Sequence, residues 1–343
     1  MRAAVFTGAG TRLDIRRVPR PDPGAGEAVL RVRACGICGS DLHASQIEGM
    51  VRPGAILGHE FAGEITELGP DPLGDWRVGD RVFSLASFTC GRCDECVGGR
   101  SHFCREGTYI GELGPDEKPG AYAEYVLAST NDLVRLPDDV GFGVGALLEP
   151  LCTAMVSIRL AELSPTARVL ILGGGPIGIA IAHVCSTIGV SRIALSEPND
   201  SRRELAGELG ATGQIDPTAS GELGEAVCDA LGAEPDVVFE AVGRPGMLNT
   251  AIAQVRRQGT VIAAGICLEP DTFDHLAAYA KEPTIKVPCY YTIADARYLV
   301  DLLRQGRLDP GPMVTHSVGL DQLPESFESL RQPSEQIKVV VEP

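Results

Sequence analysis

The stretch Arg168-Val-Leu-Ile-Leu-Gly-Gly-Gly-Pro-Ile-Gly178 decides the fold of the second half of the chain. Its apolar start suits a strand buried on both faces. A G-x-G-x-x-G turn follows directly and opens a helical pattern over 176–188, which is the context that a dinucleotide-binding turn requires. The helix N-terminus offers N–H groups to phosphates. We therefore predict dinucleotide contacts from the turn residues, although a purely structural glycine turn is the alternative; the predicted contacts are Gly173, Gly175, Pro176, Ile177 and Gly178.

Each glycine of this turn has a separate structural role. Gly173 permits the tight turn, Gly175 lets the backbone approach a pyrophosphate, and Gly178 lets the helix pack closely on the strand. Working outward, apolar runs at 192–197, 236–240 and 260–264 alternate with helical patterns at 201–209 and 247–257. Strands that alternate with helices predict a doubly wound parallel sheet.

Glu197 ends the second predicted strand, about 20 residues after the glycine turn. A carboxylate at this position can accept hydrogen bonds from the adenosine ribose hydroxyls, and it repels a 2′-phosphate. This favours NAD over NADP. Arg202 and Arg203 follow closely and could hold that phosphate instead, so NADP stays open, as does a merely solvated Glu197.

The residues before about 150 have a different pattern. Short β-like runs separated by turn signals, for example 27–33, 57–68, 80–83 and 121–127, predict a compact all-β unit. After the α/β segment, 293–304 reads as an amphipathic helix and 336–341 as a strand. A chain of 343 residues is long for one core, so we expect two domains.

Composition narrows the classes of function. The formal net charge of −16 argues against a nucleic-acid surface and against anionic membranes. No stretch approaches the roughly 20 apolar residues of a spanning helix, and the N-terminus does not read as a signal peptide. We therefore expect a soluble, cytoplasmic protein without nucleic-acid or membrane partners.

Four of the eleven cysteines crowd into one segment with the spacing C-x2-C-x2-C-x7-C. In an intracellular protein this clustering points to metal rather than to disulfides. Four thiolates suit tetrahedral Zn²⁺ without an open position, hence a structural zinc. An iron–sulfur cluster is the alternative. The predicted ligands are Cys90, Cys93, Cys96 and Cys104.

A second constellation combines Cys38, in Cys35-Gly-Ile-Cys-Gly-Ser-Asp-Leu-His43, with His59 and Glu60 in Gly58-His-Glu60. A catalytic zinc needs about three mixed ligands and one exchangeable position. Cys38, His59 and a carboxylate would serve. Glu60 and Glu149 are the candidates, and Glu149 lies in an apolar segment where a charge is costly unless paired or bound to metal.

These motifs, in this order, resemble the zinc-containing medium-chain dehydrogenases of the alcohol, sorbitol and threonine dehydrogenase type. The resemblance runs from G-I-C-G-S-D at 36–41 through G-H-E at 58–60 and the four-cysteine segment to G-G-G-P-I-G at 173–178. It implies a GroES-like β-barrel catalytic domain, residues 1–150 with 291–343 returning to it. It also implies a Rossmann cofactor domain over 151–290.

The resemblance also assigns roles to single residues. Cys38 and His59 would ligate the catalytic zinc, with Glu149 or Glu60 as the carboxylate. Ser40 would hydrogen-bond the substrate oxygen, His43 would pass its proton to solvent, and Asp41 would hold the imidazole of His59. On the cofactor side it implies contacts from Val242, Gly243, Ile266 and Lys338, the last with the pyrophosphate.

The implied reaction is hydride transfer between an alcohol and NAD, with two zinc ions per chain. Gly39 occupies a position that is Arg in some classical alcohol dehydrogenases, and together with Glu149 it favours a secondary alcohol or polyol. The alternatives are an NADP-dependent dehydrogenase of primary alcohols or aldehydes, a zinc-independent reductase of the same fold, and a non-catalytic dinucleotide-binding protein. The family usually forms homodimers or homotetramers.

Overall fold

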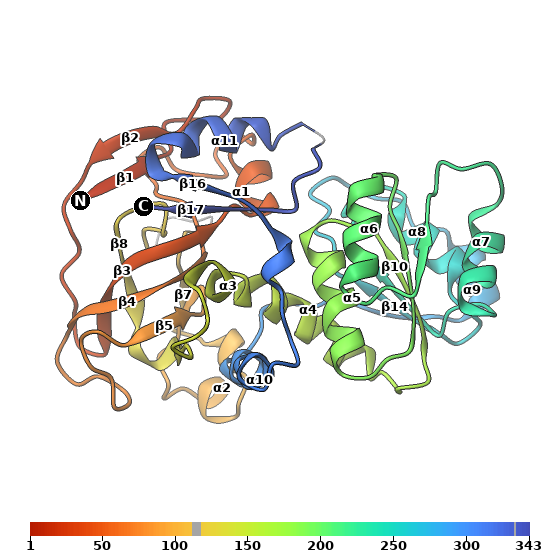
Figure 1. The fold of residues 1–343 in the computed structure, drawn as a ribbon, viewed down its shortest axis with the longest axis horizontal. Coiled ribbons are helices and arrows are strands. Elements are labelled where there is room, and N and C mark those ends of the chain that lie inside the picture. The colour runs from red at the N-terminus through yellow and green to blue at the C-terminus, as the bar shows by residue number, and fades with distance from the viewer. Residues whose placement is uncertain (112–117, 333) are drawn as a thin grey trace. The chain divides into compact units, whose positions relative to one another are not determined.

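The computed structural model describes residues 1–111, 118–332 and 334–343, and these divide into two compact units. The first unit comprises Met1–Glu149, Tyr291–Gly306 and Val314–Pro343. The second comprises Pro150–Tyr290 and Arg307–Met313. In Figure 1 the red N-terminal strands and the blue C-terminal strand β17 belong to the same unit, so the chain leaves the first unit and returns to it.

A largely antiparallel seven-stranded sheet forms the first unit. Its order is β16-β17-β3-β4-β5-β9, with β8 also paired to β3, and β16 and β17 run parallel. The strands of this unit are β1 (Arg2–Val5), β2 (Asp14–Arg17), β3 (Glu27–Gly36), β4 (Glu60–Leu68), β5 (Arg81–Ser84), β6 (Ser87–Phe88), β7 (Thr108–Tyr109), β8 (Tyr125–Ser129), β9 (Leu133–Arg135), β16 (Val314–Gly319) and β17 (Lys338–Glu342).

Strand β3 is the centre of this sheet because it pairs with β4, β8 and β17. Arg31 and Arg33 point to solvent, while the residues around them are buried. Short helices connect the strands: α1 (Gly39–Ala44), α2 (Asp94–Val97), η1 (Ser101–Phe103), η2 (Thr130–Asp132), α3 (Phe142–Ala146), α10 (Ile293–Arg304), η4 (Leu320–Gln322) and α11 (Leu323–Ser329). The unit is therefore mostly β, as the turn-rich pattern predicts.

The second unit contains a six-stranded, all-parallel sheet in the order β12-β11-β10-β13-β14-β15. Its elements are α4 (Leu148–Ala161), β10 (Arg168–Leu172), α5 (Pro176–Thr187), β11 (Arg192–Ser196), α6 (Asp200–Glu208), β12 (Gly213–Ile215), α7 (Leu223–Leu231), β13 (Val237–Glu240), α8 (Met247–Gln254), β14 (Thr260–Ala263), α9 (His275–Lys281), β15 (Thr284–Lys286) and η3 (Gly311–Met313). The strand order reverses between β10 and β13, as it does in dinucleotide-binding sheets of this topology. The predicted doubly wound sheet is confirmed.

Two expectations need correction. The predicted strand over 57–68 begins only at Glu60, because Gly58 has a φ of 95°, a left-handed conformation that interrupts an extended strand.

The second correction concerns Phe142–Ala161, which covers α3 and α4. This segment is long and apolar enough to cross a membrane by length and composition. The expectation that no stretch reaches this length is therefore wrong. Of its most apolar window, 72% is buried within the protein, as in the core helix of a globular fold.

An ion-pair cluster holds the start of β13 against the start of β10. Asp236 accepts hydrogen bonds from Arg168 N, Nε and Nη2 at 2.9, 3.0 and 3.0 Å, and from Arg256 Nε at 2.6 Å. The hydrogen bonds from Arg168 are the main reason that the pKa of Asp236 lies far below its ordinary value of 3.8. Ionised Asp236 therefore stabilises the junction at which the strand order reverses.

Replacing Asp236 by Asn should lower the free energy of unfolding by about 2 kcal/mol at pH 7. Because the pKa of Asp236 is lower in the folded state than in the unfolded chain, its contribution is complete above about pH 4 and is lost progressively as the pH falls from there towards the folded-state pKa. Urea unfolding from pH 3 to 7 should show the Asp236→Asn deficit shrinking at low pH. Asp229→Asn, on the exposed surface of α7, is the control, and a deficit independent of pH would contradict this account.

Candidate active site and metal centres

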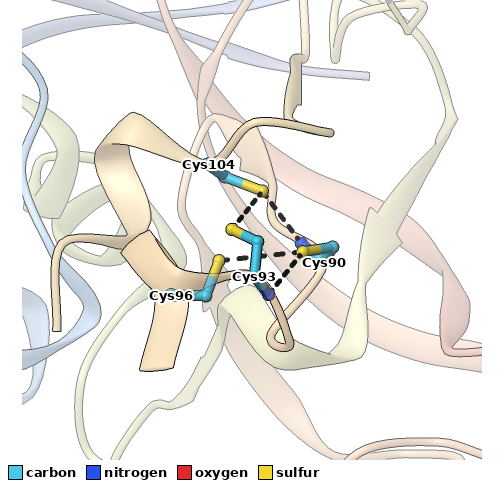
Figure 2. Close-up of side chains that lie close together, drawn as sticks. All are labelled: Cys90, Cys93, Cys96 and Cys104. Atoms are coloured by element: carbon cyan, nitrogen blue, oxygen red, sulfur yellow. Dashed lines mark hydrogen bonds between the residues drawn. The ribbon is translucent and has the colours of Figure 1, made fainter. Parts of the chain in front are cut away.

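The four cysteines of the C-x2-C-x2-C-x7-C segment converge on one point. Their sulfur atoms all lie within 4.8 Å of one another (Figure 2), with 4.0 Å between Cys90 and Cys96 and 3.9 Å between Cys93 and Cys104. Cys93 precedes α2 and Cys104 follows η1, so two short helical turns present their thiols to the centre. Thiolates at about 2.3 Å around one tetrahedral ion stand about 3.8 Å apart, so the spacing fits a single metal ion.

Backbone N–H groups favour the thiolate form of Cys90 and Cys93, whereas burial raises the pKa of Cys96 to about 12 and also raises that of Cys104. Cys90 N donates to Cys104 Sγ at 3.3 Å, and Cys93 N donates to Cys90 Sγ at 3.4 Å. Hydrogen bonds from the backbone N–H groups of Arg105 and Cys96 lower the pKa of the Cys93 thiol to about 6. Metal ligation needs thiolates, so these donors favour the binding form. A four-iron cluster would spread its thiolates over separate irons, which this close packing does not match.

A buried carboxylate anchors the segment to the rest of the first unit. Asp132 accepts hydrogen bonds from Thr89 N at 2.7 Å and from Thr89 Oγ1 at 2.8 Å. Burial raises the pKa of Asp132 to about 6 against the lowering effect of these bonds. Asn131 Nδ2 also donates to Thr89 Oγ1 at 2.6 Å. The residue immediately before Cys90 is thus fixed by η2. Asp132 was not predicted from the sequence as a partner of this segment.

The second constellation also comes together. One atom each of Cys38, His59 and Glu60 lies within 4.8 Å of the others. Cys38 precedes α1, whereas His59 and Glu60 stand where β4 begins, so two segments far apart in sequence supply the set. Cys38 is half-buried and the other two side chains are buried. A thiolate, an imidazole and a carboxylate form the mixed donor set of a catalytic zinc site.

The groups around His59 favour a positive charge at this position, either on the imidazole or on a metal ion bound to it. Burial alone lowers the pKa of His59, but the charges of Asp41 and Cys38 outweigh burial and place this pKa well above its ordinary value. His59 Nδ1 lies 3.4 Å from Asp41 Oδ1 and makes no hydrogen bond to any described residue. An ion on one ring nitrogen would fix the tautomer and direct the other nitrogen to a partner such as Asp41. The residues present therefore fit a zinc ion.

Lys338 makes a buried ion pair that the sequence did not predict. Its ammonium donates to both oxygens of Glu60 at 2.7 Å and to the carbonyl oxygen of Ile37 at 3.1 Å, and the side chain is 2% exposed. An ammonium has three donors, and all three are used. The buried charge of Glu60 requires this partner, and the contact of Lys338 with the pyrophosphate stays a prediction.

Glu149 lies near Cys38, His59 and Glu60 but is not one of the three residues whose ligand atoms lie within 4.8 Å of one another. Desolvation raises its pKa to about 7, although His59 and Lys338 oppose the shift. Tyr291 Oη donates to Glu149 Oε1 at 3.0 Å. Of the two carboxylates, Glu60 stands within the group of closely spaced ligand atoms and Glu149 does not. Tyr291, like Lys338, was missed as a partner of these acids.

The predicted proton path begins beside the thiolate. Ser40 is half-buried, and its hydroxyl donates to Cys38 Sγ at 3.1 Å. His43 follows three residues later on α1 and is exposed. Residues three apart share one face of a helix, so Ser40 and His43 face the same side.

The glycine turn of the second unit has the expected geometry. Gly173 has a φ of 100°, and a Cβ on Gly178 would lie 1.9 Å from the carbonyl oxygen of Gly173, so only glycine fits where α5 meets the turn. A Cβ on Gly175, the N-cap of α5, would meet no atom within 4 Å. Pro176 and Ile177 open the helix. The space beside Gly175 is therefore open, which suits the approach of a phosphate to the N-terminus of α5.

The carboxylate of Glu197 is held rigidly at the end of β11. It is 7% exposed, its Oε2 accepts from Gly174 N at 2.7 Å, and its Oε1 accepts from Asn199 N at 3.0 Å. Arg203 Nη1 donates to the backbone oxygen of Glu197 at 2.6 Å and also pairs with Asp200. A carboxylate has about four acceptor sites, so both oxygens can still accept from a ribose.

The remaining predicted cofactor contacts follow neighbouring strands of the sheet. Glu240 Oε1 accepts from Val242 N at 2.7 Å and from Gly243 N at 2.8 Å, which fixes the turn after β13. Val242 and Ile266 follow β13 and β14 and are 37% and 68% exposed. Apolar side chains at the carboxyl edge of a parallel sheet suit a bound ligand. Arg202 lies in the first turn of α6, where Asn199 caps its N–H group.

Comparisons with known proteins agree with this geometry. The family model for the alcohol dehydrogenase GroES-like domain matches residues 24–138, and the model for zinc-binding dehydrogenases matches residues 176–305. L-threonine 3-dehydrogenase from Aeromonas hydrophila subsp. hydrophila is 30% identical over 92% of this chain and 91% of its own. The chain therefore belongs to the zinc-dependent medium-chain dehydrogenase/reductase family, as the motifs indicated.

Solved structures are similar over the full length. Alcohol dehydrogenase TADH from Thermus sp. ATN1 has a TM-score of 0.92 at 30% identity and covers 100% of both chains. 2R,3R-butanediol dehydrogenase from Bacillus subtilis has a TM-score of 0.87 at 27% identity, covering 100% of this chain and 99% of its own. The predicted fold class, a GroES-like catalytic domain with a Rossmann cofactor domain, is confirmed. The chain is an oxidoreductase of the alcohol and polyol dehydrogenase type.

Replacing Cys93 by Ser should remove one metal ion per chain, because three thiolates hold a structural zinc far less tightly than four. Metal analysis of the purified protein should fall from about two zinc ions to about one, with a lower melting temperature. Cys289→Ser, an exposed cysteine elsewhere, should change neither value. If metal analysis of the wild-type protein found iron in place of zinc, the assignment of zinc to this segment would be wrong.

Proposed function

We propose that this protein is a zinc-dependent dehydrogenase that oxidises a secondary alcohol or polyol with NAD, or reduces the corresponding ketone. The observation that carries the proposal is the convergence of Cys38, His59 and Glu60, beside buried Glu149 and half-buried Ser40. When bound, the zinc ion supplies a Lewis acid that lowers the pKa of the substrate hydroxyl, and NAD supplies the hydride acceptor.

The residues of the chain divide the remaining work. Cys38 and His59 hold the metal, with Glu60 or Glu149 as the carboxylate ligand. Asp41 orients the imidazole of His59. The hydroxyl of Ser40 accepts the substrate proton and passes it to His43, which is exposed and can release it to water. A second zinc ion at the four-cysteine segment has a structural role.

Two further features support the substrate and the cofactor. Glu149 adds a second buried carboxylate near the metal ligands, which favours a hydroxyl-rich substrate over an apolar primary alcohol. The fixed charge of Glu197 accepts the ribose hydroxyls of NAD and repels the 2′-phosphate of NADP. The guanidinium of Arg203 is already bonded to the Glu197 carbonyl oxygen and to Asp200, which leaves it poorly placed to hold that phosphate.

The proposal also covers assembly and the dinucleotide contacts. We propose that the glycine turn, Val242 and Ile266 contact NAD, and that the enzyme works as a homodimer or homotetramer. Leu276 and Tyr279 on α9 are 77% and 83% exposed, and burial of such apolar side chains against another copy would remove them from water.

Replacing Cys38 by Ser should lower kcat by at least about 1,000-fold while NAD still binds and the fold is kept, because the metal ligand is lost and the second unit is unaffected. NADH absorbance with a panel of secondary alcohols, polyols and cyclitols measures activity, and fluorescence titration measures NADH binding. Cys228→Ser, on α7, is the control. Near-normal turnover of the Cys38 variant with one zinc per chain would refute the catalytic role.

Replacing Glu197 by Ala should reduce the ratio of kcat/KM with NAD to that with NADP by about 10-fold or more, a change of about 1.4 kcal/mol in transition-state free energy. Glu197→Gln, which removes the charge and keeps a hydrogen-bond acceptor, should fall in the same direction. Glu204→Ala on the exposed side of α6 should leave the ratio unchanged. Unaltered selectivity in both Glu197 variants would remove this residue from the cofactor site.

A further inference from the structure

Tyr122 is a buried side chain that the proposed reaction does not use. It is 0% exposed, and its ring packs edge-on against Phe327 of α11 at 6.3 Å between centroids. Its backbone N–H donates to the carbonyl oxygen of Leu57 at 2.9 Å, and Ala121 N donates to Gly58 O at 2.8 Å. The chain around Tyr122 therefore pairs with the two residues that lead directly into His59.

The hydroxyl of Tyr122 has a specific polar partner. It donates to Asp41 Oδ2 at 2.6 Å, whereas the carbonyl oxygen of Gly36 lies at 3.5 Å. A phenol has one proton, and the short contact takes it. Hydrogen bonds between a buried donor and a carboxylate are among the stronger ones in proteins. This bond fixes one oxygen of Asp41.

The other oxygen of Asp41 faces His59, with 3.4 Å between Oδ1 and Nδ1. Asp41 is 3% exposed and lies in the first turn of α1, the helix that follows Cys38. A carboxylate pinned at Oδ2 has little freedom to rotate, so Oδ1 stays directed at the imidazole. The chain of contacts runs from Tyr122 through Asp41 to His59.

The ring of Tyr122 lies beside Gly58, the residue that precedes His59. A Cβ on Gly58 would lie 2.5 Å from Tyr122 Cδ1, so the ring fills the space beside a residue whose φ is 95°. Glycine is needed there on both counts. Tyr122 thus contacts the residue before His59 with its ring and the residue that faces His59 with its hydroxyl.

We propose that Tyr122 is a positioning residue of the catalytic metal site, and that its hydroxyl acts through Asp41 to hold His59 in the orientation that binds the metal. The inference rests on the proposed function, since it takes Cys38 and His59 as metal ligands. Outer partners of metal ligands commonly change metal affinity by 10- to 100-fold when they are removed.

The test is metal affinity at the catalytic site of the full chain, measured with Co²⁺ as the probe by competition with a chelator. The part of the cobalt spectrum that Cys38→Ser abolishes reports the catalytic site. Tyr122→Phe keeps the ring against Gly58 and removes only the hydroxyl, and it should weaken cobalt binding about 10-fold. Tyr125→Phe, whose ring lies 4.5 Å from the Arg20 guanidinium carbon, is the matched control and should bind as the wild type does.

A double-mutant cycle separates positioning from general packing. Asp41→Asn alone should also weaken cobalt binding, and adding Tyr122→Phe to it should change the affinity by less than about twofold, because both variants break one chain of contacts. Tyr122→Phe with unchanged affinity, or with its full effect in the Asp41→Asn background, would overturn the inference. A wild-type protein without any Cys38-dependent cobalt signal would instead overturn the proposed function on which it rests.

Discussion

The buried ion pair between Lys338 and Glu60 is the interaction on which the metal site depends. A charged ammonium at 2% exposure is tolerated only when its donors are satisfied, and here Glu60 and the carbonyl oxygen of Ile37 satisfy all three. Glu60 follows His59, and Ile37 precedes Cys38. One side chain from the last strand therefore joins the two segments that supply the metal ligands, with Ile37 N also donating to Val339 O at 2.9 Å.

The return of the chain to the first unit has a chemical consequence. Both Tyr291, which donates to Glu149, and Lys338 come from residues after the parallel sheet of the second unit. The acids of the site thus receive their partners only when the C-terminal segment has folded back. The predicted dinucleotide site of the second unit needs no such distant segment. One strand–turn–helix unit and the strand beside it bring Gly173, Gly178 and Glu197 together.

Local patterns made much of this predictable. The glycine turn and the four-cysteine segment each depend on residues that are close in sequence, the alternation of strands and helices predicts the parallel sheet, and helix Ile293–Arg304 has the predicted bounds. What escaped prediction depends on distant partners. Lys338 lies in an apolar run, which signals that its charge is paired, but the sequence does not name Glu60. Tyr122 and Tyr291 read as ordinary core residues, because only the tertiary structure places their hydroxyls beside Asp41 and Glu149. The roles assigned to Ser40, His43 and Glu197 stay predictions.

The most direct measurement is anomalous X-ray diffraction at the zinc edge from crystals of the purified protein. The account predicts two zinc peaks per chain, one among the four cysteines and one about 2.3 Å from Cys38 Sγ and about 2.0–2.1 Å from a ring nitrogen of His59. A single peak at the four cysteines, with no metal between Cys38 and His59 in protein that is active on alcohols, would contradict it.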